Sequence, residues 1–254
     1  MTNTKNPEIE TSQIVSFRTE KHTLEQILKS VNCVNEESVT VNLDQSGLFF
    51  RGMDRSHVSL IDMRLSETIF QNWNVKEEIK ISFNPETFLK IVKSLDKKQS
   101  VLVEIFKDEI KISNKESSTL LNRGESSDQD TPLPKIPYDQ KITSTQNEFL
   151  KVLKSLVVVG DYVTIEKTFD NCYVSSKGDQ GASKNELSTV FNFGTSQEIS
   201  ESTYSFEYLI PFLKSVPKDQ IIDLEFSTSK PCRLTTKINN IGMIQFYLAP
   251  RVET

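Results

Sequence analysis

Apolar residues recur at the spacing of one helical face in four short stretches of the chain. The four sets, in chain order, are Leu24, Ile27, Leu28 and Val31; Phe88, Ile91, Val92 and Leu95; Phe149, Val152, Leu153 and Leu156; and Leu209, Phe212, Leu213 and Val216. Each set follows the i, i+3, i+4, i+7 pattern, which places its members on one side of a helix. The pattern predicts four short amphipathic helices.

Each predicted helix contains the same motif of two apolar residues, Lys, Ser and a further apolar residue. It reads ILKSV, IVKSL, VLKSL and FLKSV and recurs at near-even spacing, which indicates a repeated structural unit. The lysine of the motif points away from the apolar stripe. These outward lysines are Lys29, Lys93, Lys154 and Lys214, and Lys90 and Lys151 share the outer side of their helices.

Two of the helix starts carry a recognisable signal. Asn84 precedes Pro85, which is the order of an N-cap followed by proline at the first helical position. For the third helix, either Thr145 or Asn147 is able to supply the cap.

Between the helices, short β-branched and alternating runs such as SVTVNL, HVSLIDMRL and CRLTTKI predict strands. Units of one helix and several short strands pack as antiparallel sheets with the helices on one face, an α+β class. Residues 116–140 are polar and predict an exposed connector. It separates an N-terminal domain, 13–115, from a C-terminal domain, 141–254, while 1–12 are expected to be disordered.

The composition is that of an intracellular protein without a membrane span. The chain has 36% hydrophobic and 26% charged residues and a net charge of −5, which leaves room for a local basic face. No apolar run approaches a membrane-spanning length, and the polar start is not a secretory signal. The three cysteines are far apart and lack CxxC spacing, so neither disulfides nor a zinc site are expected.

The stretch MDRSHVSL contains the residue types of a nucleophilic triad, namely Asp54, Ser56 and His57. Neighbours on an extended strand alternate sides, so Ser56 and His57 are expected to point in opposite directions. No glycine-flanked nucleophile elbow surrounds Ser56, and one histidine with one aspartate lacks a third metal ligand. We therefore expect no catalytic residue, no metal site and no enzyme.

Two motifs give the chain a family resemblance. SGLFFRGMDRSHVSLIDMRL resembles the early segment of PCNA, the family of DNA sliding clamps of archaea and eukaryotes, and GMIQFYLAPRVE is similar to that family's C-terminal strand and tail. The resemblance covers residues 13–254, and the ending FYLAPRVE looks closer to archaeal than to animal clamps.

The resemblance implies a trimeric ring that DNA passes through and that has no enzymatic activity and no cofactor. Each chain would supply two similar domains, with antiparallel sheets outside and two helices each on the inner face. The implied partners are double-stranded DNA without sequence preference, a clamp loader, and DNA polymerase, ligase and flap nuclease, bound through PIP-box peptides. The implied place is with the chromosome, in the cytoplasm if the chain is archaeal and in the nucleus if it is eukaryotic.

The resemblance also assigns roles to particular residues. The DNA-facing residues would be Lys29, Lys90, Lys93, Lys151, Lys154 and Lys214. The groove for the PIP-box peptide would be lined by Met53, His57, Val58, Leu60, Leu133, Ile136, Pro231, Tyr247, Ala249 and Pro250. The register of the connector is open, and Tyr138 is an alternative contributor. Glu25 and Gln26 stand where relatives often carry basic residues, which predicts thinner DNA contact at the first helix.

Assembly would pair a strand at about 109–114 with a strand at about 183–190 of the next chain, and Ser188→Pro would weaken that pairing. A checkpoint-type clamp subunit or another ring-forming scaffold is the alternative to the replication clamp.

Overall fold

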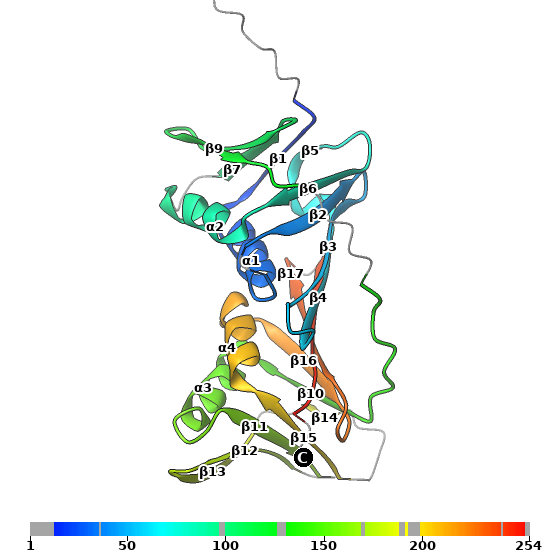
Figure 1. Ribbon diagram of the computed structural model, residues 1–254, viewed down its shortest axis with the longest axis vertical. Helices are drawn as coiled ribbons and strands as arrows, with labels where there is room; N and C mark the ends of the chain where they lie inside the picture. Colours follow the sequence, from blue (N-terminus) through cyan, green and yellow to red (C-terminus); the bar gives the residue numbers. More distant parts are fainter. Residues whose placement is uncertain are drawn as a thin grey trace, which may run out of the picture.

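The computed structural model describes residues 13–35, 37–96, 100–125, 131–168, 171–187, 191–192, 199–239 and 241–251 (Figure 1). The disorder expected for residues 1–12 lies outside the described residues. The four expected helices are present: α1 (Lys21–Asn32), α2 (Pro85–Ser94), α3 (Gln146–Leu156) and α4 (Phe206–Ser215).

Side-chain caps fix the starts of three helices. The Asn84 side chain accepts a hydrogen bond from the backbone N–H of Thr87 at 2.6 Å, as expected for α2. Thr145 accepts from the N–H of Glu148, which decides the alternative left open for α3 in favour of Thr145. Ser205 caps α4 in the same way. The helix boundaries therefore follow from local hydrogen-bond chemistry.

The strands form three antiparallel sheets. The five-stranded sheet has the order β5 (Gln71–Asn74), β1 (Val15–Glu20), β7 (Ser100–Ile105), β8 (Glu109–Ser113) and β9 (Ser118–Asn122). The four-stranded sheet has the order β13 (Gly181–Glu186), β12 (Cys172–Gly178), β11 (Tyr162–Lys167) and β15 (Ser200–Ser205). The nine-stranded sheet has the order β14 (Phe191–Asn192), β10 (Gln140–Thr145), β16 (Ile221–Phe226), β17 (Cys232–Ile238), β18 (Gly242–Leu248), β4 (Ser59–Ser66), β3 (Gly47–Met53), β2 (Val39–Asp44) and β6 (Ile79–Phe83).

The nine-stranded sheet joins the two halves of the chain. Strand β18, from the C-terminal half, pairs with β4, from the N-terminal half, in a register that runs from Met243 opposite Arg64 to Leu248 opposite Ser59. One hydrogen-bonded sheet therefore crosses from one half into the other.

The helices bury their apolar faces against the sheets. In the C-terminal half, the rings of Phe212 on α4 and Phe246 on β18 stack with centroids 4.5 Å apart. Between the halves, α1 contacts α4, and the buried hydroxyls of Ser30 and Ser215 lie 3.1 Å apart. The serine of the repeated motif thus lies at the junction of the halves in α1 and α4.

Of the two stretches expected to form sheet edges for assembly, 109–114 and 183–190, one does not form an edge. The stretch at 109–114 is wrong as an edge, because β8 pairs with β7 on one side and with β9 on the other. The edge strand next to β8 is β9, which lies inside the range 116–140 expected as connector. Strand β13 is an open edge and covers part of the second stretch, whereas Ser188 lies outside the described residues.

The three cysteines are free in the structure, and two of them, Cys172 and Cys232, are buried. Among the described residues, no helix has both the length and the apolar character needed to cross a membrane.

Candidate functional site

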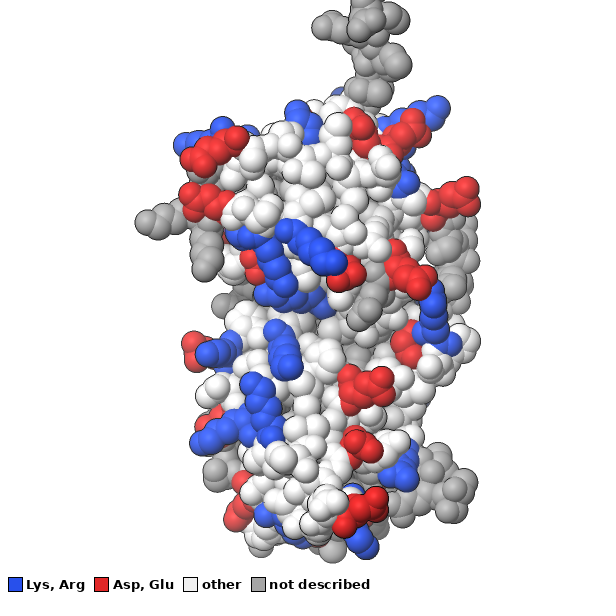
Figure 2. All heavy atoms as spheres, turned by 60° about the vertical axis from the view of Figure 1, so that its left-hand side comes forward, with Lys and Arg blue, Asp and Glu red and all other residues white. Residues whose placement is uncertain are grey.

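The four helices lie side by side on one face of the molecule. Helix α1 contacts both α2 and α4, and α4 contacts α3, which gives the order α2, α1, α4, α3 (Figure 1). Basic side chains gather over this face in the space-filling view (Figure 2). We call it the helix face. The exposed lysines on the helices are Lys90, Lys93, Lys151, Lys154 and Lys214, and Lys29 is partly buried.

Ion pairs with glutamates reduce the positive charge of the helix face, most of all at α1. The ammonium of Lys29 lies 3.0 Å from Oε2 of Glu25, one turn earlier on the same helix. On α2, Lys90 pairs with Glu86 at 2.7 Å, but both side chains are largely exposed to solvent. The ion pair of Lys29 is the more sheltered of the two, so α1 presents the least available positive charge.

A further lysine has a structural role that its sequence does not reveal. The side chain of Lys21 is buried, and its ammonium donates to the backbone carbonyls of Lys93, at 2.9 Å, and of Leu95. These carbonyls belong to the C-terminal end of α2, where a cation satisfies orphan acceptors. Lys21 therefore ties α1 to α2 and does not contribute to the helix face.

Asp54 closes the turn between β3 and β4. Its Oδ1 accepts from the backbone N–H of Val58 at 2.8 Å and its Oδ2 from that of Ser56 at 2.9 Å. His57 adopts a left-handed backbone conformation, φ 58°, and its side chain is exposed. The carboxylate is fully used as a turn acceptor. The polar residues of this stretch therefore shape a turn.

The pairing of β3, β4 and β18 places groove candidates from the N-terminal half beside one from the C-terminal half. Met53 lies opposite Leu60, and Leu60 lies opposite Tyr247, so the three residues share one row across β3, β4 and β18. The backbone N–H of Ala249 donates to the carbonyl of Val58 at 2.8 Å. Segments far apart in the sequence thus meet at one surface.

Burial divides the groove candidates into a floor and a rim. Leu60 and Tyr247 are 2% and 4% exposed, so they lie beneath the surface and would form the floor of the expected groove. The partly exposed candidates are Met53, Val58, Leu133, Ile136, Pro231, Ala249 and Pro250. Pro231 directly precedes Cys232, which pairs with Leu248, and therefore lies close to Ala249.

The connector is held to the sheet at two points. At Thr131, past its middle, the backbone carbonyl accepts from the Arg51 guanidinium at 3.2 Å. Near its end, the ring of Tyr138 lies 5.1 Å from the Arg233 guanidinium, and burial raises the pKa of the Tyr138 phenol. Arg233 is the register partner of Tyr247, so Tyr138 lies near the row of groove candidates. Leu133 and Ile136 lie on the connector between these two points.

The described residues contain no group of three or more His, Cys, Asp or Glu side chains that could hold a metal ion. The candidate binding surfaces among the described residues are the basic helix face and the partly apolar row of groove candidates. Both suit binding rather than covalent chemistry.

Two α+β halves that share one sheet and carry their helices on one common face define a two-domain clamp fold. Residues 18–128 match the family description "Proliferating cell nuclear antigen, N-terminal domain", and residues 132–251 match "Proliferating cell nuclear antigen, C-terminal domain". The chain belongs to the PCNA family of DNA polymerase sliding clamps, which are not enzymes.

Relatives of similar length support this assignment. The chain is 38% identical over 237 residues to a DNA polymerase sliding clamp of Nitrosopumilus maritimus, which covers 91% of this chain and 95% of the relative. A sliding clamp of Cenarchaeum symbiosum is also 38% identical, over 240 residues, with 91% and 95% of the two chains covered.

Solved structures show the same fold. The PCNA structure from Thermococcus kodakaraensis superposes with a TM-score of 0.87 at 18% identity and covers 93% of this chain and 100% of the other. A structure described as the C-terminal region of FEN-1 bound to A. fulgidus PCNA superposes with a TM-score of 0.84 at 18% identity, covering 94% and 99%.

Proposed function

We propose that three copies of this chain form a ring around duplex DNA and tether polymerase, ligase and flap nuclease through peptides that bind the groove. A clamp loader would open the ring, and the protein would act inside the cell on the chromosome. The observation that carries the proposal is the helix face, on which four equivalent helices present lysines on the same side. Lysine–phosphate contacts hold DNA without reading its sequence, which suits sliding.

The peptide groove supports the tethering role. Its rim is mostly apolar, and its floor comes from both halves of the chain through the pairing of β4 with β18. An apolar anchor of a peptide gains free energy when it is buried against such a surface. A family relative, the PCNA of A. fulgidus, has been solved with the C-terminal region of FEN-1 bound, which supports a peptide ligand of this kind.

The open edges support ring formation. Strands β9 and β13 end their sheets, and Leu120 on β9 is 55% exposed. Two open antiparallel edges are able to pair between neighbouring copies. A structure from Sulfolobus tokodaii, with a TM-score of 0.84, is described as a complex of two different PCNA chains, which makes a ring of paralogues the alternative to a homotrimer.

The test reverses the charge of the helix face. A variant with Glu at Lys90, Lys93, Lys151, Lys154 and Lys214 should keep its oligomeric mass and lose polymerase stimulation. The matched control reverses five exposed lysines outside the four helices, namely Lys76, Lys107, Lys135, Lys177 and Lys237. Equal loss in both variants would point to net charge alone, and full processivity in the helix variant would refute the DNA-facing assignment. A checkpoint-type clamp would fail to stimulate the replicative polymerase even as the wild type.

A further inference from the structure

A buried carboxylate on β4 holds two guanidinium groups. The side chain of Asp62 is only 4% exposed. Its Oδ1 accepts a hydrogen bond from Nε of Arg51 at 2.7 Å, and its Oδ2 accepts from Nε of Arg64 at 3.1 Å. Charge-assisted hydrogen bonds to a sheltered carboxylate are strong and directional, so Asp62 fixes the orientation of both arginines.

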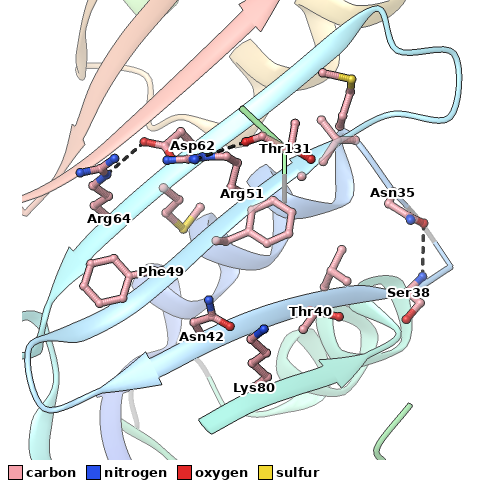
Figure 3. Close-up of a pocket in the computed structure, with 16 residues that line it drawn as sticks. Asn35, Ser38, Thr40, Asn42, Phe49, Arg51, Asp62, Arg64, Lys80 and Thr131 are labelled. Atoms are coloured by element: carbon pink, nitrogen blue, oxygen red, sulfur yellow. Dashed lines mark hydrogen bonds and ion pairs between the residues drawn. The ribbon is translucent and has the colours of Figure 1, made fainter. Parts of the chain in front are cut away.

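Arg51 uses a second nitrogen atom to reach the connector. Its Nη1 donates to the backbone carbonyl of Thr131 at 3.2 Å while its Nε remains on Asp62. Figure 3 shows the Arg51 guanidinium between Asp62 and Thr131, with Arg64 on the opposite side of Asp62. The Arg51 side chain is 30% exposed and that of Arg64 is 52% exposed, so water weakens the bonds of Arg51 less.

The bond between Arg51 and Thr131 lies close in sequence to groove candidates on both segments. Met53 follows Arg51 by two residues on β3, and Leu133 follows Thr131 by two residues on the connector. Two residues of extended chain span at most about 7 Å. The position of Thr131 therefore limits how far Leu133 is able to lie from this part of β3.

The connector after this bond has a restricted backbone. Residues 131–138 read TPLPKIPY and contain three prolines, so we call them the proline-rich segment. Proline fixes its own φ angle and disfavours helical conformations of the residue before it. Proline-rich segments are therefore extended and act as semi-rigid spacers. A displacement at Thr131 should be passed along the segment and not absorbed within it.

The other end of the proline-rich segment is held independently of Arg51. The backbone N–H of Asp139 donates to Oγ of Ser227 at 2.9 Å, and the Ser227 hydroxyl donates to the carbonyl of Pro137 at 3.3 Å. The side chains of Leu133 and Ile136, between the two ends, are half-buried. With one end fixed at Ser227, the contact with Arg51 determines where the other end lies.

We propose that Arg51, oriented by Asp62, is a positioning residue of the peptide groove, which holds the proline-rich segment so that Leu133 and Ile136 face the docked peptide. The inference rests on the proposed peptide-binding function. Arg51 acts through the connector and does not touch the peptide. A segment that is held in place before binding loses less conformational entropy when the peptide binds, which raises the affinity.

The test compares variants of the two arginines that share Asp62. Arg51→Gln removes the bond to Thr131. Arg64→Gln is the matched control, because it removes the same charge and one bond to the same carboxylate, on the side away from the connector. Arg51→Lys keeps the charge but lacks the planar guanidinium that bonds Asp62 and Thr131 together. It should behave as Arg51→Gln does and takes its place if that variant fails to fold.

The first measurement is the rate at which trypsin cleaves the folded protein after the exposed Lys135, followed by mass spectrometry. Cleavage needs local release of the proline-rich segment, and its rate follows the released population. Arg51→Gln should raise this rate by about tenfold, the effect of losing one hydrogen bond to a charged group. Arg64→Gln should be cleaved after Lys135 at the rate of the wild type.

The second measurement is calorimetric titration with a peptide that carries one aliphatic and two aromatic anchors. Arg51→Gln should weaken binding by about tenfold, because the released segment must be ordered again in the complex. Arg64→Gln should bind the peptide as the wild type does.

Faster cleavage together with weaker binding, in the Arg51 variants and not in Arg64→Gln, supports the inference. Weaker binding with unchanged cleavage would mean that Arg51 contacts the peptide directly. Faster cleavage with unchanged binding would mean that the proline-rich segment does not shape the groove. Either result overturns the inference alone, as does an equal change in Arg64→Gln or no change in any variant. If no peptide binds the wild type, the proposed peptide groove is wrong and the inference is wrong with it.

Discussion

Tyr247 on β18 lies directly opposite Leu60 on β4, and both side chains are almost fully buried. The pair links β18, the last strand of the C-terminal half, to β4, the second strand of the β3–β4 hairpin. Because the two residues lie beneath the surface of the proposed peptide groove, they would couple its shape to the packing between the halves.

Because Leu60 is buried and Met53 is partly exposed, mutations at the two residues should affect different quantities, namely stability and peptide affinity. Leu60→Ala should lower the free energy of unfolding by about 2–5 kcal/mol, because it leaves a cavity at a buried site. Met53→Ala, at the partly exposed rim, should weaken binding of an anchor peptide by about tenfold, since one apolar anchor contact is worth roughly 1.5–3 kcal/mol when fully buried. Urea unfolding and peptide calorimetry on both variants separate the two effects. A Met53→Ala protein that binds as the wild type does would remove Met53 from the groove.

Glu25 should limit the hold of the first helix on DNA. The ion pair between Glu25 and Lys29, at 3.0 Å, neutralises a lysine that would otherwise face phosphate. Glu25→Gln should therefore strengthen DNA association at low salt, by about threefold, and make its salt dependence steeper. Fluorescence anisotropy of loaded clamp on a duplex, measured over a salt series, gives both quantities. Glu86→Gln on α2 is the control, because its partner Lys90 is already well exposed.

Assembly should depend on the backbone of β9. The backbone N–H of Asn114 donates to the carbonyl of Ser117, so by alternation the N–H of Leu120 points away from β8, toward the open edge. Leu120→Pro should remove a donor needed between copies and shift the protein toward monomer without breaking the β8–β9 pairing. Leu120→Ala keeps the N–H and serves as the control. Sedimentation velocity decides; an unchanged assembly in Leu120→Pro would exclude β9 as the pairing edge.

Alkaline pH should destabilise the fold through its buried thiols. Burial raises the pKa of Cys172 from 9.0 to about 12. The unfolded chain then loses this proton at lower pH than the folded chain, so the stabilisation is complete below about pH 9 and is lost as the pH rises toward 12. Stability should fall by up to about 1.4 kcal/mol per pH unit for this group. Urea unfolding of the wild type and Cys172→Ala at about pH 8 and about pH 10.5 tests the slope, which should be shallower in the variant.

Much of the fold could be predicted from patterns among residues that are close together in the sequence. The four helices, the Asn84 cap and the common outward position of the lysines follow from periodicity and capping chemistry within a few residues of each helix. The edge strand at 109–114 came instead from the family resemblance, and it is wrong. The true edge strand, β9, is short and polar at its ends and lies within the polar range that predicts the connector.

The candidate site depended more on long-range contacts. The family resemblance named Leu60 and Tyr247, but only the β4–β18 register reveals that they are buried. Lys21 resembles any lysine at a helix start, and its burial against the end of α2 is a tertiary effect. The separation of β2 from β3 beyond Asn42 and Phe49 has no signature in the alternation of either strand.

The sheet that runs without interruption from β14 to β6 has a mechanical consequence. Bending one subunit between its halves would require shearing the β4–β18 hydrogen bonds and the contact of Ser30 with Ser215, so each subunit behaves as a stiff arc. In the proposed ring, the compliant points would be the seams between subunits, where a short strand such as β9 would provide few hydrogen bonds. Opening should therefore occur as a rupture at one seam, with the other arcs keeping their curvature.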